Sequence, residues 1–181
     1  MTTHAETPPS FVDKVKGTKT ASGLPYPKWY IPIVAAVGGM LSIMVLQLFS
    51  VNWELIPCFI VPFGASCVLL YAAPAAPFSQ PRNLVGGHII AALVGVAVFV
   101  VFKEASWWTL ALANGLAIAL MVATKTVHPP AGATAFLPLI SGITDWTWVL
   151  VPVGVGTLIL LVIALIYNNV FKHQRYPAFW Y

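Results

Sequence analysis

Long apolar segments are the feature that most constrains how this chain of 181 residues can fold. A helix needs about 20 predominantly apolar residues to cross the hydrocarbon core of a bilayer. Five stretches reach or approach that length: residues 31–50, 55–73, 84–102, 107–124 and 149–169. Only 8% of the residues are charged, against about 25% in soluble domains. The sequence therefore predicts an all-α polytopic membrane protein surrounded by a lipid bilayer.

Positive charges outside these segments indicate the topology, because cytoplasmic loops of membrane proteins are enriched in Lys and Arg. Four lysines precede the first span, and Arg82 lies between the second and third spans. We therefore expect residues 1–28 to be a disordered cytoplasmic tail, residues 29–171 to form the transmembrane domain, and residues 172–181 to be a short cytoplasmic tail. The net charge of +4 comes mostly from tails and loops, so we expect no nucleic-acid partner.

Residues 128–142 decide whether both ends of the chain face the same side. If this segment were a cytoplasmic loop, the basic residues after the last span would lie outside, against the positive-inside rule. If the segment crosses or half-crosses the membrane, the C-terminus lies inside. Five tryptophans then gather at the outer interface, as is typical of membrane proteins: Trp53, Trp107, Trp108, Trp146 and Trp148. We therefore predict six membrane segments with both termini in the cytoplasm.

Two short stretches of the sequence resemble each other. Residues 62–69 read PFGASCVL and residues 130–137 read PAGATAFL, so that Ser66 pairs with Thr134. One interpretation is chance similarity between two apolar segments. The other is an internal repeat of three membrane segments, in which the odd number inserts the second half in the opposite orientation. Inverted repeats with broken helices that meet near the membrane midplane are a common transporter architecture.

The prolines of these stretches predict where the helices break. Proline is favoured in the first turn of a helix, where its missing N–H group is not needed. Pro62 and the Pro129-Pro130 pair would therefore each begin a half-helix. The N-terminus of a helix carries free N–H groups and a partial positive charge, so two converging N-termini would bind an anion. The amides that would line this site belong to Gly64, Ala65, Gly132 and Ala133.

Two hydroxyl groups and a histidine lie close to these breaks in the sequence. Ser66 and Thr134 can donate hydrogen bonds to an oxyanion, or they can bond back to a carbonyl of their own helix. His128 directly precedes the double proline, and an ionisable residue inside a membrane is a functional candidate by default. Its alternative role is a structural hydrogen bond that closes the unwound turn. We expect His128 to contribute to the anion site in a pH-dependent way, because histidine titrates near neutral pH.

Four further polar residues flank these segments. Lys125 can line the site, or it can extend to the membrane interface as a snorkelling cation. Arg82 can attract anions to a cytoplasmic vestibule, or it can anchor the topology. His88 can be a second polar contact with the anion, or it can be an interfacial histidine. Asn83 is expected to cap the helix that follows it.

An enzymatic function is not expected. All acidic residues lie outside the predicted spans, and the sequence contains no metalloprotease or serine-hydrolase motif. The histidines and cysteines are not clustered, so we expect neither a metal site nor a cofactor. A non-transporting membrane subunit or sensor is the alternative to transport. Glycine pairs such as Gly38-Gly39 would allow helices of a homo-oligomer to approach closely.

The block HPPAGATA at residues 128–135, with QPRNLVGGH at residues 80–88, resembles the HPP family of integral membrane proteins. The family takes its name from the His-Pro-Pro motif, and the similarity extends from about residue 29 to residue 170. Plant chloroplast-envelope members and similar cyanobacterial proteins are implicated in nitrite transport. The resemblance therefore implies nitrite or a related small anion as the substrate, and a cyanobacterial-like bacterial inner membrane as the location. The residues taken alone indicate only an anion.

Overall fold

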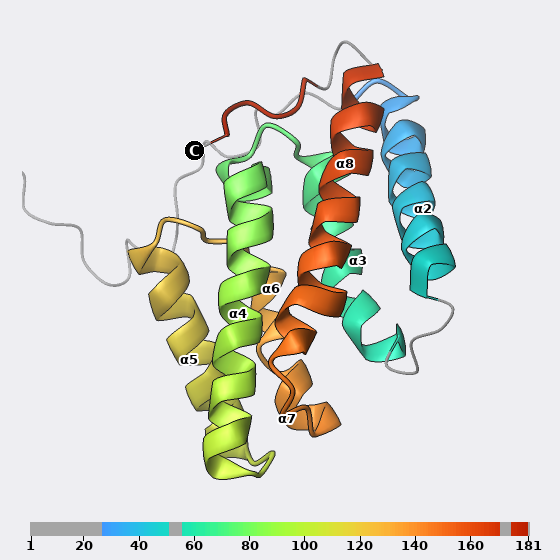
Figure 1. The fold of residues 1–181 in the computed structure, drawn as a ribbon. Helices are drawn as coiled ribbons and strands as arrows, with labels where there is room; N and C mark the ends of the chain where they lie inside the picture. The colour runs from blue at the N-terminus through green and yellow to red at the C-terminus, as the bar shows by residue number, and fades with distance from the viewer. Residues whose placement is uncertain (1–26, 51–55, 171–174, 181) are drawn as a thin grey trace, which may run out of the picture.

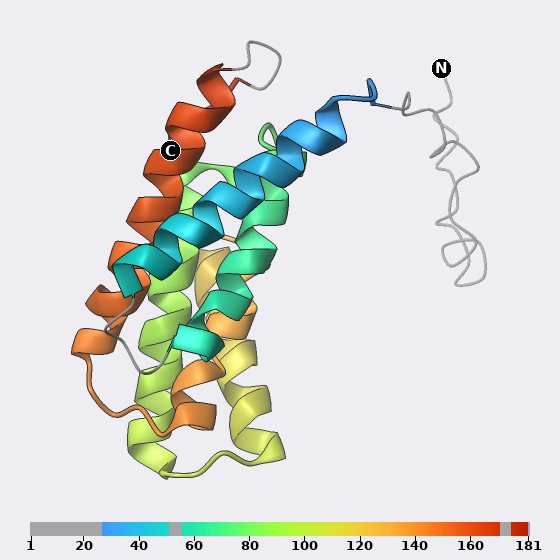
Figure 2. The ribbon, with the colours of Figure 1, turned by 90° about the vertical axis from the view of Figure 1, so that its right-hand side faces the viewer.

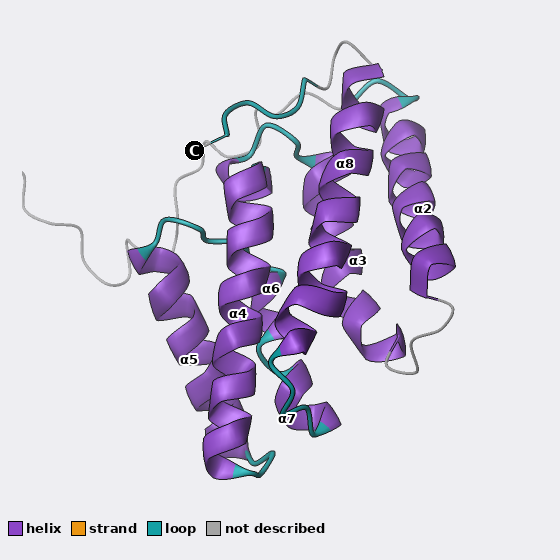
Figure 3. Ribbon diagram, viewed as in Figure 1, coloured by secondary structure: helices purple, strands orange, loops and turns teal. Residues whose placement is uncertain are grey.

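The computed structural model of the chain describes residues 27–50, 56–170 and 175–180, and within these residues every regular element is a helix (Figures 1 and 3). In chain order the elements are α2 (Ile31–Ser50), α3 (Ile56–Ala72), the short η1 (Pro77–Ser79), α4 (Pro81–Phe102), α5 (Trp107–Ala123), α6 (Ala131–Thr134), α7 (Leu137–Ser141), η2 (Val149–Gly154) and α8 (Val155–Val170). The all-α prediction is confirmed for the described chain. Trp53 and nearly all of the predicted N-terminal tail lie outside the described residues.

Three segments are long and apolar enough to cross a membrane: Ile31–Leu48, Pro81–Phe102 and Val149–Val170. Shorter apolar helices cover Val61–Ala72, Trp107–Ala123 and Ala131–Ser141. Large apolar side chains such as Met44 and Val162 are exposed on the outer faces of these helices. Extensive exposed apolar surface marks contact with a membrane or a partner, so the helices are suited to lipid on their outer faces.

Successive helices run in alternating directions along the bundle (Figure 1). The start of α2, the loop between α3 and α4, the end of α8 and residues 175–180 lie at one end. The loop between α4 and α5 and the segment between α7 and η2 lie at the opposite end. The two ends of the described chain therefore share one side of the bundle. Which side faces the cytoplasm remains a prediction.

Helix α4 occupies the centre of the bundle, where it contacts α5, α6, α7, η2 and α8. Helix α2 lies obliquely across α3 and α8 on the outside (Figure 2). Buried apolar side chains form one core around α2, α3, α4 and α8, which includes Leu70 and Leu160. A second core between α4, α5 and the α6–α7 segment includes Ala91 and Ala117. Because α4 contributes to both cores, it connects the two sides of the molecule.

Small residues on α4 allow this helix to lie directly against the α6–α7 segment. A Cβ atom added at Gly95 would lie 2.5 Å from the carbonyl oxygen of Ala135. One added at Gly87 would lie 2.7 Å from the Cβ atom of His128. Real Cβ atoms do not approach other atoms so closely. Glycine at these two positions therefore brings the backbones together at the level of the predicted site.

The predicted helix breaks are found in only one of the two similar stretches. The segment 128–142 is broken into the short helices α6 and α7, as the prolines predict. Helix α3, however, continues through Pro62, so the prediction that Pro62 begins a half-helix is wrong. A proline inside a helix removes one backbone hydrogen bond, and membrane helices tolerate this loss because neighbouring groups can compensate for it.

The last predicted span contains a break that the sequence interpretation missed. Val151 has φ −131° and ψ 114°, which is extended backbone inside η2. The next residue is Pro152, and a proline restricts the residue before it to extended conformations. Residues 149–169 were predicted as an apolar membrane span, and the structure has a segment of suitable length and composition there, Val149–Val170. What the sequence interpretation did not anticipate is the kink at Pro152 near the start of this span.

Candidate functional site

Four polar side chains meet inside the bundle, and all four were predicted site residues. Ser66 comes from α3, His88 from α4, Thr134 from α6, and His128 from the turn before α6. Each has an exposed fraction of 0–1%. Buried polar groups require hydrogen-bond partners, and these four residues find them largely in one another. We refer to Ser66, His88, His128 and Thr134 as the histidine cluster.

The ring of His88 joins the two hydroxyl groups. Its Nε2 atom lies 2.9 Å from Ser66 Oγ, and its Nδ1 atom lies 2.8 Å from Thr134 Oγ1. Ser66 and Thr134 are the residues that the internal comparison places at equivalent positions. The imidazole therefore bridges α3 and α6 at the two hydroxyls that stand at matching positions in the similar stretches.

The ring of His128 joins Ser66 to the loop between α3 and α4. Its Nε2 atom lies 2.9 Å from Ser66 Oγ, and its Nδ1 atom lies 2.8 Å from the carbonyl oxygen of Phe78. The centroids of the two histidine rings are 5.0 Å apart. Ser66 Oγ thus lies within hydrogen-bond distance of both imidazoles, and it is the central atom of the cluster.

The positions of the hydrogens follow from which groups can accept. The Phe78 carbonyl can only accept, so Nδ1–H of His128 donates to it, and Nε2 of a neutral His128 is left as an acceptor. Ser66 has one hydroxyl hydrogen and donates it to this Nε2. The Nε2–H of His88 then donates to Ser66 Oγ, and its Nδ1 accepts from Thr134. This assignment gives every ring nitrogen a partner.

Ser66 has a second acceptor in reach, since its Oγ atom lies 3.0 Å from the carbonyl oxygen of Pro62. If His128 carries a second proton at Nε2, that N–H donates to Ser66 Oγ, and the hydroxyl must turn its own hydrogen to Pro62. The cluster can therefore accept one proton by rotation of a single hydroxyl group. The predicted back-bond to the carbonyl of its own helix is therefore within reach of Ser66, while donation to an oxyanion stays a prediction.

The backbone amides that were predicted to line an anion site are occupied. The amides of Ala131, Gly132 and Ala133 donate to carbonyls three residues earlier, at 2.9, 3.1 and 3.2 Å. Gly64 and Ala65 lie inside the continuous helix α3, where amides bond to the preceding turn. The prediction of two converging helix N-termini with free N–H groups is therefore wrong. What converges instead is a set of side chains.

The two predicted cations lie outside the histidine cluster. Arg82 is exposed, and its Nη2 atom donates to the carbonyl oxygen of Thr124 at 2.6 Å. A cation at the C-terminal end of a helix complements the partial negative charge there, so Arg82 stabilises the end of α5. Lys125 follows that end, is exposed, and has a positive φ of 58°. Neither side chain reaches the buried site.

Asn83 has a different role from the predicted one. Gln80 is the N-cap of α4 and Pro81 occupies the first turn, so the prediction that Asn83 caps this helix is wrong. Asn83 is buried, and its Nδ2 atom donates to the carbonyl oxygen of Val127 at 2.8 Å. This bond ties α4 to the turn that carries His128. Asparagine in the first turn of α4 therefore positions the histidine.

A hollow of about 400 Å³ lies on the outer face of the protein beside the cluster. Its lining comes from two elements: Val61, Pro62, Ala65 and Leu69 from α3, and Pro129, Pro130 and Ala133 from the broken segment. Ala65 and Ala133 directly precede Ser66 and Thr134 in the sequence. Four of the predicted site residues (Ala65, Pro129, Pro130 and Ala133) thus line the hollow, with apolar groups at its surface.

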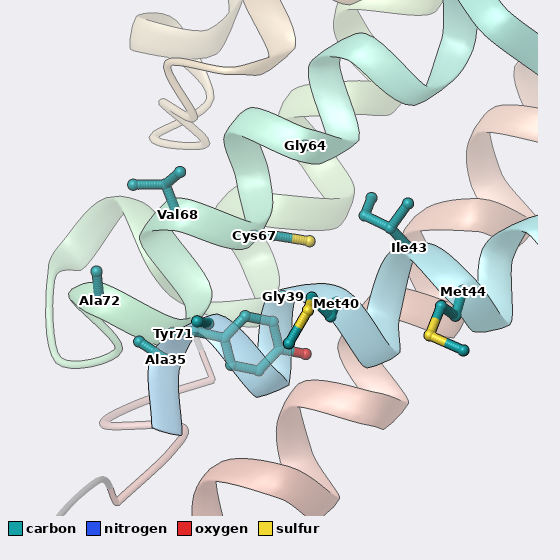
Figure 4. Close-up of a pocket in the computed structure, with 11 residues that line it drawn as sticks. Ala35, Gly39, Met40, Ile43, Met44, Gly64, Cys67, Val68, Tyr71 and Ala72 are labelled. Atoms are coloured by element: carbon teal, nitrogen blue, oxygen red, sulfur yellow. The ribbon is translucent and has the colours of Figure 1, made fainter. Parts of the chain in front are cut away.

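A larger hollow of about 710 Å³ lies between α2 and α3 (Figure 4). Gly39 and Met40 line it from α2, and Gly64 and Cys67 line it from α3. Gly64 therefore faces this hollow and not the histidine cluster. The lining is almost entirely apolar, so the hollow offers no set of donors for an anion. It is suited to hydrocarbon.

Sequence reasoning missed the group that accepts the hydrogen bond from His128 Nδ1, and no feature of the sequence could have identified it. The group is the backbone carbonyl of Phe78, and a carbonyl carries no information about residue type. In the part of the chain that the structure describes, no group of three or more His, Cys, Asp or Glu side chains is placed to hold a metal ion. The chemistry available in the cluster is hydrogen bonding and proton transfer.

Comparison with known proteins gives one family. The family model described as HPP, transmembrane region, matches residues 25–177. A transmembrane protein of Dictyostelium discoideum is 45% identical over 125 residues, which is 66% of this chain and 40% of the relative. Another transmembrane protein of the same organism is 38% identical over 125 residues, covering 66% of this chain and 44% of the relative. The chain therefore spans less than half the length of these two relatives. No solved structure matches.

Proposed function

The chain belongs to the HPP transmembrane-region family, and from that premise we propose that this membrane protein transports small anions, with nitrite as the first substrate to test. The observation that supports this function is the buried histidine cluster. Ionisable residues inside a membrane protein are costly, and they commonly mark pathways for ions or protons. Irregular backbone at membrane depth occurs where it is buried in protein or lines an aqueous path. The cluster and the broken segment meet at the same place.

The proposal includes six membrane segments arranged as an inverted repeat. Two contacts support it beyond the sequence match. His88 bonds to both Ser66 and Thr134, and α2 packs on α8 while α5 packs on α4. A two-fold relation between the halves α2–α4 and α5–α8 would produce this exchange of partners. In this arrangement both termini face the cytoplasm, and a bacterial inner membrane is the proposed location.

In the proposed mechanism the structure represents a closed conformation. When the broken segment moves away from α3 and α4, Ser66 loses His128 and Thr134 loses His88. An unsatisfied buried donor or acceptor costs about 1–3 kcal/mol. A small anion supplies replacement acceptors for these O–H and N–H groups. Binding by neutral donors is weak enough to permit release on the other side. A proton on His128 would strengthen the contact with the anion.

A non-transporting membrane subunit or sensor is the alternative, and one observation favours it. Every ring nitrogen and hydroxyl of the cluster already has a partner within the chain, as in a purely structural network.

Assembly into a homo-oligomer is also proposed. Gly38 is not available for such an interface, because a Cβ atom there would lie 2.6 Å from the ring of Tyr71. Catalysis is not part of the proposal.

Nitrite flux into liposomes that contain the purified protein tests transport directly. Thr134→Val removes a hydroxyl from the cluster and keeps the side-chain shape. Thr157→Val is a matched control, because buried Thr157 bonds to the Gly154 carbonyl three residues earlier, at 2.8 Å, and not to the cluster. The proposal predicts flux above that of protein-free liposomes, reduced about tenfold by Thr134→Val if the anion feels its hydroxyl directly, and unchanged by Thr157→Val. Wild-type flux equal to that of protein-free liposomes would favour the non-transporting subunit.

A further inference from the structure

The loop between α3 and α4, residues 73–80, lies at the end of the bundle where α8 ends (Figure 1). The carbonyl of Phe78 in this loop accepts the hydrogen bond from His128 Nδ1 at 2.8 Å. The neighbouring residue Ser79 is buried, and its hydroxyl donates to the carbonyl of Ala73 at 2.8 Å. The loop is therefore folded back onto the end of α3, and it is in direct contact with His128.

A C-terminal segment is fastened to the same loop. Tyr176 has an exposed fraction of 1%, and its hydroxyl donates to the carbonyl oxygen of Ser79 at 2.8 Å. That carbonyl belongs to the residue next to Phe78. The Tyr176 hydroxyl and the His128 imidazole thus bond to successive carbonyls of one loop, and only one residue of backbone separates the C-terminal segment from the cluster.

Gln80 forms the second connection between the segment and the loop. Its Oε1 atom accepts from the amides of Ala178 and Phe179 at 2.8 and 3.3 Å. Its Nε2 atom donates to the carbonyls of Pro74 and Ala76 at 2.9 and 2.8 Å. Gln80 is fully buried. One amide side chain therefore holds the loop in its folded form and the C-terminal segment on top of it.

We propose that residues 176–179 form a strap that keeps the loop closed over His128, and that release of the strap opens the cluster to water at this end of the bundle. Four hydrogen bonds and one buried ring hold the strap: the bonds of Tyr176, Ala178 and Phe179 above, and one from Asn169 Nδ2 to the Tyr176 carbonyl. The strap residues themselves belong to no helix. The strap can therefore detach while α3, α4 and α8 remain folded.

The strap matters for transport only if the proposed function holds, but the opening can be measured without transport. Carbethoxylation of His128 by diethyl pyrocarbonate, followed by mass spectrometry, reports access to this imidazole in lipid nanodiscs. Tyr176→Phe removes one hydroxyl and keeps the ring. Tyr167→Phe is the matched control, because Tyr167 donates to the backbone carbonyl of Val34 at 2.9 Å away from the cluster. A chain that ends at Arg175 removes the strap altogether.

We expect His128 to react slowly in the wild type and about fivefold faster in Tyr176→Phe. The labelling rate follows the ratio of open to closed molecules, and the loss of one ordinary hydrogen bond raises this ratio about fivefold. The shortened chain should react faster still, and Tyr167→Phe should react at the wild-type rate. Equal protection of His128 in the wild type and Tyr176→Phe, with both proteins folded by circular dichroism, would overturn the strap. Faster labelling without nitrite flux in any variant would support the strap and refute transport. Nitrite flux in the wild type, with His128 labelled at the same rate in every variant, would support transport and refute the strap.

Discussion

Replacement of Ser66 by alanine should destabilise the protein more than any other loss of one hydroxyl in the chain. Ser66 Oγ accepts from His88 Nε2 and donates to His128 Nε2, both at 2.9 Å. Alanine leaves both ring nitrogens buried without a partner. Each orphaned group costs about 1–3 kcal/mol, so Ser66→Ala should lower the free energy of unfolding by about 2–6 kcal/mol. Thr157→Val, which removes a local bond to a carbonyl three residues earlier, should cost no more than about 1 kcal/mol.

Unfolding in detergent micelles, followed by circular dichroism with a denaturant, measures both variants under the same conditions. The double variant Ser66→Ala with His128→Ala gives a second test, since contacting residues are not additive. It should be less destabilised than the sum of the two single variants, because removal of His128 also removes one orphaned nitrogen. Equal destabilisation by Ser66→Ala and Thr157→Val would refute the bonding assigned to the cluster.

Other predictions concern packing, topology and pH. Gly95→Ala should lower the free energy of unfolding by about 1–3 kcal/mol, because the added Cβ atom would lie 2.5 Å from a carbonyl oxygen. Gly115→Ala should leave the free energy of unfolding unchanged or raise it, because the added Cβ atom would meet no neighbouring side chain or other helix within 4 Å. Thermal unfolding of the pair tests this contrast. Asp145→Cys in a cysteine-free background should react with a membrane-impermeant thiol reagent from outside the cell, and labelling only from the cytoplasmic side would contradict the six-segment topology. Wild-type nitrite flux should change with pH, because protonation of His128 would add a positive charge beside the anion. His128→Ala should remove that change. Identical pH profiles of the wild type and His128→Ala would show that His128 has only a structural role.

The members of the cluster could be predicted from the sequence because polar residues are conspicuous in apolar segments. Ser66, His88, His128 and Thr134 were all identified, and the apolar runs predicted the helices that carry them. The contacts among them could not be predicted, since they depend on how closely α4 approaches the broken segment. Glycine at position 87 permits that approach, but a glycine in a membrane helix has several possible uses.

The errors of the sequence interpretation concern backbone conformation. A proline in an apolar segment shows that one hydrogen bond is lost, but not whether the helix ends there. Helix α3 continues through Pro62, whereas the chain is extended before Pro152 and broken at Pro129-Pro130. The outcome depends on packing around each proline. The Phe78 carbonyl and the Tyr176 strap have no sequence signature, because each of their contacts joins a side chain to a main-chain atom.

The central claim is that a small anion binds at the histidine cluster. Nitrogen-15 NMR of histidine-labelled protein in nanodiscs, with and without nitrite, tests it most directly. Without nitrite, we expect His128 to carry its hydrogen on Nδ1 and His88 to carry its hydrogen on Nε2. Saturating nitrite should shift the resonances of both rings in the wild type, and Thr134→Val should require more nitrite for the same shift. Ring resonances that stay unchanged at nitrite concentrations that saturate flux would contradict an anion site at this cluster.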